Sequence, residues 1–110
     1  MPDLTTSFSA LSDATRLAIV EQLMDEGERT AGDLVSQAGM TGPAVSRHLK
    51  ILRNAGLVRQ RAEGTKRLYS VCPEGLRVIA DWTISRRAFW ENSLDRLEAA
   101  IAEETGGANG

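Results

Sequence analysis

The chain has 110 residues, 42% hydrophobic and 25% charged, which is enough for one domain with a modest core and excludes a disordered chain. No apolar run approaches the roughly 20 residues that a bilayer-spanning helix needs, so a membrane protein is excluded. The single cysteine, Cys72, excludes an intrachain disulfide, and no secretory signal is visible at the N-terminus. We therefore expect a cytoplasmic protein.

The net charge of −2 is distributed unevenly along the chain. Residues 42–70 hold seven Lys and Arg against one acid, Glu63, which gives this segment +6 and leaves −8 for the rest. A basic segment on an acidic body gives local affinity for phosphates and favours docking in one orientation. The charge pattern therefore points to nucleic acid as a partner.

Three helices are predicted before the basic segment. The first covers residues 4–11, where three apolar residues recur at helical spacing: Leu4, Phe8 and Leu11. The second covers residues 14–24, and its predicted buried face consists of Leu17, Val20, Leu23 and Met24. The third covers residues 31–38, and Thr30 and Asp33 are spaced as a capping box at its start.

The stretch 41–56 has the signals of a complete helix. Thr41 is a suitable N-cap, Pro43 fits the first turn, and Gly56 fits a left-handed terminus. One face is apolar at positions i, i+4 and i+7, namely Val45, Leu49 and Leu52. The opposite face is short, polar and basic, as a helix in a DNA major groove requires. Residues 39–41 form a short connection containing glycine, which is typical of a helix-turn-helix.

Residues 57–71 change to a period of two. Strands over residues 57–62 and 66–71 around a turn at residues 63–65 predict a β-hairpin. Its arms carry four cations: Arg59, Arg61, Lys66 and Arg67. Alone, a basic hairpin would be a solvated edge that resists aggregation. Directly after a helix-turn-helix, it indicates the phosphate-contacting wing of a winged helix.

The last predicted helix covers residues 74–104, and residues 105–110 are expected to be a flexible tail. Apolar residues recur along the helix at steps of three and four, a seam of the coiled-coil type. Such a helix would be about 45 Å long, more than the core of a small domain covers. The same helix of a second copy would bury the exposed seam.

The order and spacing of these elements resemble the ArsR/SmtB family of winged-helix bacterial repressors. The resemblance covers residues 4–104 and is carried by three strings, residues 11–19, 44–58 and 61–69. It implies a single winged helix-turn-helix domain over residues 1–110, mainly α with a small β-hairpin. It also implies a homodimer joined through the helices at residues 1–12 and 74–104, which represses transcription from an inverted-repeat operator.

The predicted DNA-binding residues are Thr41, Gly42, Pro43, Ala44, Ser46, Arg47, His48, Lys50, Arg59, Arg61, Lys66 and Arg67. The predicted dimer interface consists of Leu4, Phe8, Leu11, Trp82, Phe89, Trp90, Leu94, Leu97 and Ile101. Many members of the family carry glutamine at the position of Gly42. Backbone contacts or Thr41 would then replace that side chain.

Neither a metal nor another cofactor is predicted. Metal-sensing members carry cysteines in the helix before the recognition helix, or Asp, His and Glu ligands on the last helix. This chain has no cysteine in residues 31–38, and its only histidine, His48, lies in the predicted recognition helix, where it faces DNA or packs. Without a second histidine, a paired cysteine or a glycine-rich phosphate loop, no enzyme activity is predicted.

The alternative function is a protein-interaction module, with the winged helix as scaffold and the aromatic last helix as the binding surface. The charge split favours double-stranded DNA, because an interaction module has no need for a +6 segment. Trp82, Phe89 and Trp90 could line an effector pocket at a dimer interface, but aromatic residues on a long helix are more often packing. The sequence therefore leaves a small-molecule effector open without supporting one.

Overall fold

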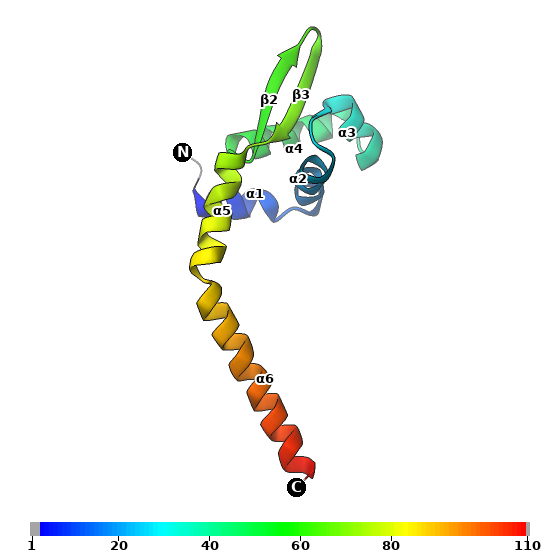
Figure 1. The fold of residues 1–110 in the computed structure, drawn as a ribbon. Coiled ribbons are helices and arrows are strands. Elements are labelled where there is room, and N and C mark those ends of the chain that lie inside the picture. Colours follow the sequence, from blue (N-terminus) through cyan, green and yellow to red (C-terminus); the bar gives the residue numbers. More distant parts are fainter. Residues whose placement is uncertain (1–2, 110) are drawn as a thin grey trace. The chain divides into compact units, whose positions relative to one another are not determined.

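The computed structural model describes residues 3–109, with side chains through residue 105. The chain consists of two compact units, one ending at Ile79 and one beginning at Ala80. The elements, labelled in Figure 1, are α1 (Leu4–Leu11), α2 (Ala14–Glu26), β1 (Arg29–Thr30), α3 (Ala31–Ala38), α4 (Gly42–Asn54), β2 (Val58–Glu63), β3 (Lys66–Val71), α5 (Pro73–Ser85) and α6 (Arg87–Asn109).

The first unit contains a three-stranded antiparallel sheet in the order β1-β3-β2. Val58 of β2 lies opposite Val71 of β3, and Glu63 lies opposite Lys66, which confirms the predicted hairpin. On the other side of β3, Arg29 of β1 lies opposite Tyr69. The sequence did not predict β1, because a strand of two residues has no alternating pattern to detect.

The core of the first unit forms where the helices meet the sheet. The predicted apolar face of α4 is confirmed, since its three members are at most 1% exposed: Val45, Leu49 and Leu52. They join a cluster that includes Leu23, Leu34, Leu57 and Tyr69. This packing fixes which face of α4 remains open to solvent.

The prediction for the buried face of α2 was partly wrong. Val20 and Leu23 are buried, but Leu17 and Met24 are 41% and 57% exposed. Ile19 is buried instead and forms a narrow stripe with Val20 and Leu23. At 100° per residue, Leu17 and Met24 lie about 100° around the helix from the centre of that stripe.

The ends of α4 match the predicted signals. The Thr41 hydroxyl accepts a hydrogen bond from the backbone N–H of Ala44 at 3.3 Å, and Pro43 lies in the first turn. The helix ends at Asn54, and Gly56 follows with φ of 77°, in the left-handed region. Both ends are therefore fixed by local chemistry.

The start of α5 packs closely on the segment that follows α4. The backbone N–H of Cys72 donates to the carbonyl oxygen of Leu57 at 2.8 Å. Gly75 is buried, and a Cβ atom there would overlap the carbonyl oxygen of Gly56 and lie 2.7 Å from its carbonyl carbon. This junction therefore has room only for glycine at position 75.

The single long helix predicted over residues 74–104 is wrong, because the structure divides it into α5 and α6 at Arg86. The Ser85 hydroxyl donates to the carbonyl oxygen of Trp82 at 2.9 Å. The backbone N–H of Arg86 is shared between the carbonyl oxygens of Trp82, at 3.1 Å, and Thr83, at 3.3 Å. A serine hydroxyl bonded to the preceding turn competes with the regular helical ladder and bends helices.

The tail expected at residues 105–110 also differs from the structure, which continues α6 through Asn109. The Thr105 hydroxyl donates to the carbonyl oxygen of Ile101 at 2.8 Å. Extending an existing helix adds one backbone hydrogen bond for each residue that is fixed, which favours continuation. Gly110 lies outside the described residues.

Candidate nucleic-acid interface

Helices α3 and α4 form the helix-turn-helix. Between them, Gly39 has φ of 64° and ends α3 in the left-handed conformation. Thr41 then caps α4, so the connection consists of three residues. This confirms the predicted motif, and it places α4 as its second helix.

The open face of α4 carries free polar and basic side chains. Ser46, Arg47 and Lys50 are exposed, and none has a hydrogen bond or ion pair from its side chain within the described part of the chain. Near the start of the helix, Gly42 and Ala44 are half-buried and Pro43 is exposed. Small residues at this end allow the backbone to approach another surface closely.

The structure brings His48 to α2, about 100° around α4 from Arg47. His48 is half-buried, and its Nδ1 atom lies 3.4 Å from Nη1 of Arg16. The Nε of Arg16 donates to the carbonyl oxygen of Ala10, at the end of α1, at 2.7 Å. The Arg16 side chain, on α2, therefore contacts both α1 and α4.

Asp13 completes the surroundings of Arg16. Its carboxylate caps α2 by accepting from the backbone N–H groups of Thr15, at 2.9 Å, and Arg16, at 3.1 Å. The hydrogen bond from the Arg16 backbone lowers the pKa of this carboxyl most, and the Thr15 bond and the charge of Arg16 lower it further. Asp13 is therefore the N-cap of α2.

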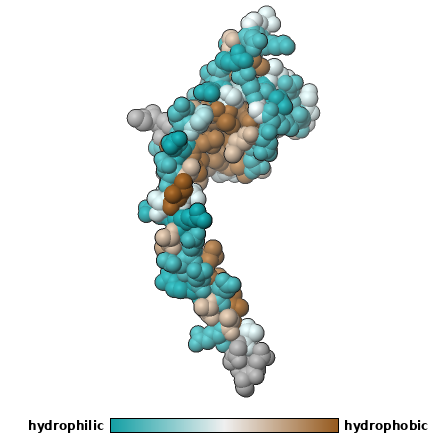
Figure 2. Space-filling model, viewed as in Figure 1, coloured by the Kyte–Doolittle hydropathy of each residue, from teal (hydrophilic) through white to brown (hydrophobic). Residues whose placement is uncertain are grey.

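The hairpin of β2 and β3 turns at Gly64, where φ is 62°. Its four predicted cations are not equivalent. Lys66 and Arg67 are exposed near the tip and have no ion pair or side-chain hydrogen bond among the residues described. Arg59 donates from Nε to the hydroxyl of Ser70 at 3.3 Å. Arg61 forms ion pairs with the carboxylates of Glu28 and Glu63. In Figure 2 hydrophilic side chains cover most of the hairpin.

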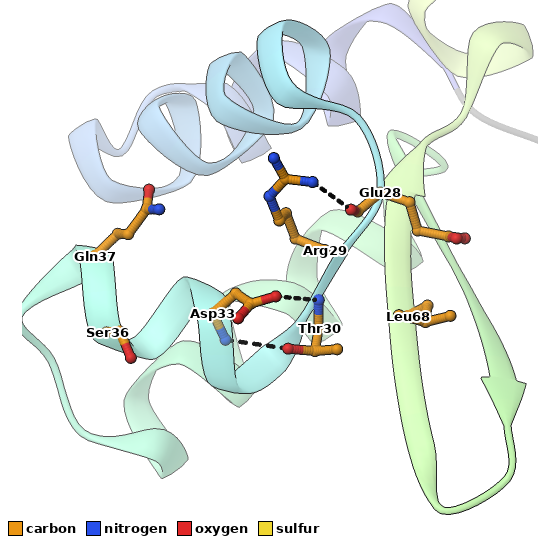
Figure 3. A pocket seen from close by; sticks show the side chains of 7 residues that line it. All are labelled: Glu28, Arg29, Thr30, Asp33, Ser36, Gln37 and Leu68. Atoms are coloured by element: carbon orange, nitrogen blue, oxygen red, sulfur yellow. Dashed lines mark hydrogen bonds between the residues drawn. The ribbon is translucent and has the colours of Figure 1, made fainter.

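Beside the hairpin, a polar cavity of about 320 Å³ lies between β1, α3 and β3 (Figure 3). Thr30 and Asp33 form the predicted capping box at its edge, with Thr30 Oγ1 accepting at 3.1 Å and Asp33 Oδ2 accepting at 3.3 Å. The remaining lining residues are Glu28, Arg29, Ser36, Gln37 and Leu68. The aromatic residues that could have lined an effector pocket do not contribute to this cavity.

No group of three or more His, Cys, Asp or Glu side chains within the described residues is arranged to hold a metal ion. Cys72 is half-buried, and its thiol donates to Oε2 of Glu74 at 3.2 Å. The pKa of Glu74 is lowered mainly by a hydrogen bond from its own backbone N–H, and to a smaller extent by the hydrogen bond from this thiol. Among the same residues, no helix is both long and apolar enough to cross a membrane.

The residues predicted for a dimer interface leave apolar surface exposed in the single chain. In α1, Phe8 is 42% exposed, while Leu4 and Leu11 are half-buried. In the second unit, Trp82 is half-buried. The rings of Phe89 and Trp90 pack edge to face, with their centroids 5.1 Å apart. The other exposed residues of α6 on this seam are Leu94, Leu97 and Ile101. Figure 2 shows apolar side chains interrupting the hydrophilic surface of the second unit.

Two groups of residues around the interface were not found from the sequence. Arg16 contacts His48, which lies 32 residues later in the sequence, and Glu28 contacts Arg61, which lies 33 residues later. No local spacing rule connects residues so far apart, because the contacts depend on how the helices and strands pack.

Comparison with known proteins places this geometry in one family. Residues 13–60 match the family model described as "Bacterial regulatory protein, arsR family". The "HTH-type transcriptional regulator Rv2034" of Mycobacterium tuberculosis is 44% identical over 98 residues, which cover 89% of this chain and 88% of that protein. A "Probable mercury resistance operon repressor" of Streptomyces lividans is 44% identical over 71 residues, 64% of this chain and 56% of that protein.

Solved structures agree with the sequence comparisons. The solution structure of the "homodimeric winged helix-turn-helix DNA-binding domain" Mb0332 from Mycobacterium bovis superposes with a TM-score of 0.63 at 28% identity. The match covers 80% of this chain and 82% of that one. The chain therefore belongs to the arsR family of bacterial regulatory proteins, which are DNA-binding transcription regulators and not enzymes.

Proposed function

We propose that the chain acts as a homodimeric repressor that binds an inverted-repeat operator without a metal-sensing site. The observation that carries this proposal is a set of exposed side chains on α4 and the wing tip that have no ion pair or side-chain hydrogen bond within the described part of the chain: Ser46, Arg47, Lys50, Lys66 and Arg67. These groups provide hydrogen-bond donors and positive charge on a chain whose net charge is −2. Free cations on the two elements of a winged helix that meet DNA fit phosphate and base contacts.

Helix α4 and the β2–β3 hairpin have different roles in DNA recognition. The start of α4, from Thr41 to Ala44, lies close to DNA because its side chains are small. Arg47 reads base edges from the middle of the open face, since a bidentate arginine is the commonest specific contact with guanine. Lys66 and Arg67 contact phosphates, which positions the protein but carries no sequence information. His48 contacts DNA from the side of α4 that lies next to Arg16.

Dimerisation explains the exposed apolar residues on α1 and α6. A two-fold dimer buries the same patch on both copies and fixes the separation of the two recognition helices. The Mycobacterium bovis relative is described as homodimeric, which supports the same assembly here. An interaction with a different protein through α6 is the alternative, and the oligomeric state of the purified chain distinguishes the two.

The absence of a metal sensor is proposed from the ligand inventory. Soft metals such as mercury, cadmium and arsenite require thiolate ligands, and the chain has one cysteine and one histidine. The Streptomyces relative named for mercury resistance matches only 64% of this chain, so its metal response does not transfer with the match. We expect calorimetry with micromolar zinc, cadmium or arsenite to show no stoichiometric binding. One tight zinc per subunit that is lost with His48→Gln or Cys72→Ser would contradict this.

The base-reading role of Arg47 tests the proposal at one residue. Arg47→Ala should weaken binding to an operator selected from random DNA more than binding to unrelated DNA, by roughly 1–3 kcal/mol of discrimination. Fluorescence anisotropy with both DNA molecules measures this difference. Arg67→Ala is the matched control, because loss of a phosphate contact lowers both affinities alike. An equal loss for Arg47→Ala would show that Arg47 contacts only phosphate.

A further inference from the structure

The shortest ion pair among the described residues of the first unit connects the wing, the β2–β3 hairpin, to the segment that precedes β1. The Nε of Arg61 donates to Oε2 of Glu28 at 2.7 Å, and Nη2 of Arg61 donates to Oε1 at 2.7 Å. Both nitrogens of one edge of the guanidinium therefore meet both oxygens of one carboxylate. This two-bond geometry fixes orientation as well as distance.

The position of this pair in the sheet gives it a specific mechanical role. β1 and β2 both pair with β3, and neither pairs with the other. Arg61 lies opposite Leu68 on one side of β3, and Thr30 lies opposite the same Leu68 on the other side. Because Glu28 is two residues before Thr30, its bond to Arg61 reaches across β3. Figure 3 shows the Glu28 side chain extending past this strand.

The surroundings of Arg61 also oppose a contact with DNA. Its Nη2 atom lies 3.0 Å from Oε2 of Glu63, in addition to the bonds with Glu28. Two carboxylates thus surround one guanidinium, and the hydrogen bond from Arg61 lowers the pKa of Glu28. The Nε and Nη2 donors on this edge of the guanidinium are therefore already bonded to carboxylate oxygens and are not free to bind a phosphate. Lys66 and Arg67 have no such partners among the described residues.

We propose that Glu28 and Arg61 are wing-positioning residues, and that Arg61 holds β2 relative to β1 instead of contacting a DNA phosphate. The inference rests on the proposed function, in which the wing tip contacts phosphates. The pair keeps the hairpin at the inclination that lets Lys66 and Arg67 reach the backbone. Arg61 thereby leaves the set of DNA-contacting cations that the sequence predicts.

The salt dependence of operator binding separates a positioning residue from a phosphate ligand. Each phosphate contact contributes about 0.9 to the slope of log K against log salt concentration. We expect Arg61→Gln and Glu28→Gln each to weaken binding several-fold with the wild-type slope, and the double variant to be no weaker than either. Arg67→Gln, the matched control on β3, should lower the slope by about one unit.

Rescue by exchanging the charges completes the test. Glu28→Arg combined with Arg61→Glu should restore most of the affinity that either single reversal loses. A slope reduced by about one unit in Arg61→Gln, or tighter binding by Glu28→Gln, would show that Arg61 is a phosphate ligand and overturn the inference.

A measurement without DNA separates this inference from the proposed function. In the free protein, Glu28→Gln and Arg61→Gln should accelerate hydrogen exchange of the backbone amides that pair β1 and β2 with β3, whereas Arg67→Gln should not. If Arg67→Gln and Lys66→Gln leave the salt slope unchanged, the wing tip does not contact phosphate and the proposed function is at fault. Unchanged exchange in both pair variants would overturn the positioning role itself.

Discussion

The exposed leucines of α6 give a quantitative test of the proposed dimer. Leu94 and Leu97 are 63% and 57% exposed in the single chain, so more than half of each side chain can be buried by a partner. Complete burial of a leucine side chain contributes about 1.5–3 kcal/mol, and the exposed part beyond what alanine retains contributes about 1 kcal/mol. A two-fold dimer contains four such side chains, so Leu94→Ala with Leu97→Ala should cost about 4 kcal/mol of association free energy.

This cost corresponds to a dimer Kd raised roughly 1,000-fold, because 1.4 kcal/mol is a factor of ten. Sedimentation equilibrium over a wide range of protein concentration measures the change directly. The matched control is Asn92→Ala with Glu103→Ala, because these residues lie on the opposite face of α6 at 100° per residue. The control should keep the wild-type Kd, while the double leucine variant should also lose operator affinity without touching DNA.

Two outcomes would refute the reasoning. An unchanged dimer Kd in the double leucine variant would show that the seam of α6 does not mediate self-association. A wild-type protein that sediments as an 11.9 kDa monomer and still binds an inverted repeat cooperatively would assign α6 to another partner. Circular dichroism of each variant confirms that the helix itself is retained.

Two further predictions concern stability, each measured by denaturant unfolding. Ser7→Ala should stabilise the fold by about 1 kcal/mol, because the Ser7 hydroxyl is buried without a hydrogen bond among the described residues. Ser9→Ala, at an exposed position of the same helix, should leave the stability unchanged. A destabilised Ser7→Ala variant would show that the hydroxyl has a hydrogen-bond partner. Gly75→Ala should lower the free energy of unfolding by roughly 2 kcal/mol, because its Cβ atom would overlap the backbone of Gly56. Gly32→Ala should be tolerated, because its Cβ atom would lie 3.8 Å from the Thr30 hydroxyl. Equal stability of the two variants would show that the backbone at the junction shifts to make room.

Features encoded by residues close together in the chain could be predicted from the sequence. The capping box of Thr30 and Asp33 depends on residues three positions apart, and its two hydrogen bonds form as expected. The same holds for α4, which is fixed by Thr41 at its start and Gly56 after its end. The helix-turn-helix and hairpin follow from such signals, and the comparisons support the family that they indicated.

Features that depend on packing could not be predicted. No proline or glycine marks the break between α5 and α6 in the sequence. The break involves the Ser85 hydroxyl and the shared backbone N–H of Arg86. The pairing of Arg61 with Glu28 depends on the order of strands in the sheet. A count of cations therefore gives the charge of the wing, but only the structure distinguishes bound from unbound cations.

The sequences that the purified chain selects from a pool of random double-stranded DNA test the central claim most directly. A two-fold dimer with α4 in successive major grooves should enrich inverted repeats whose half-sites are centred about 10–11 base pairs apart. Arg47→Ala should lose the enrichment at a defined position of each half-site. Enrichment of a single asymmetric half-site, or no enrichment above the starting pool, would contradict a homodimer that reads an inverted repeat.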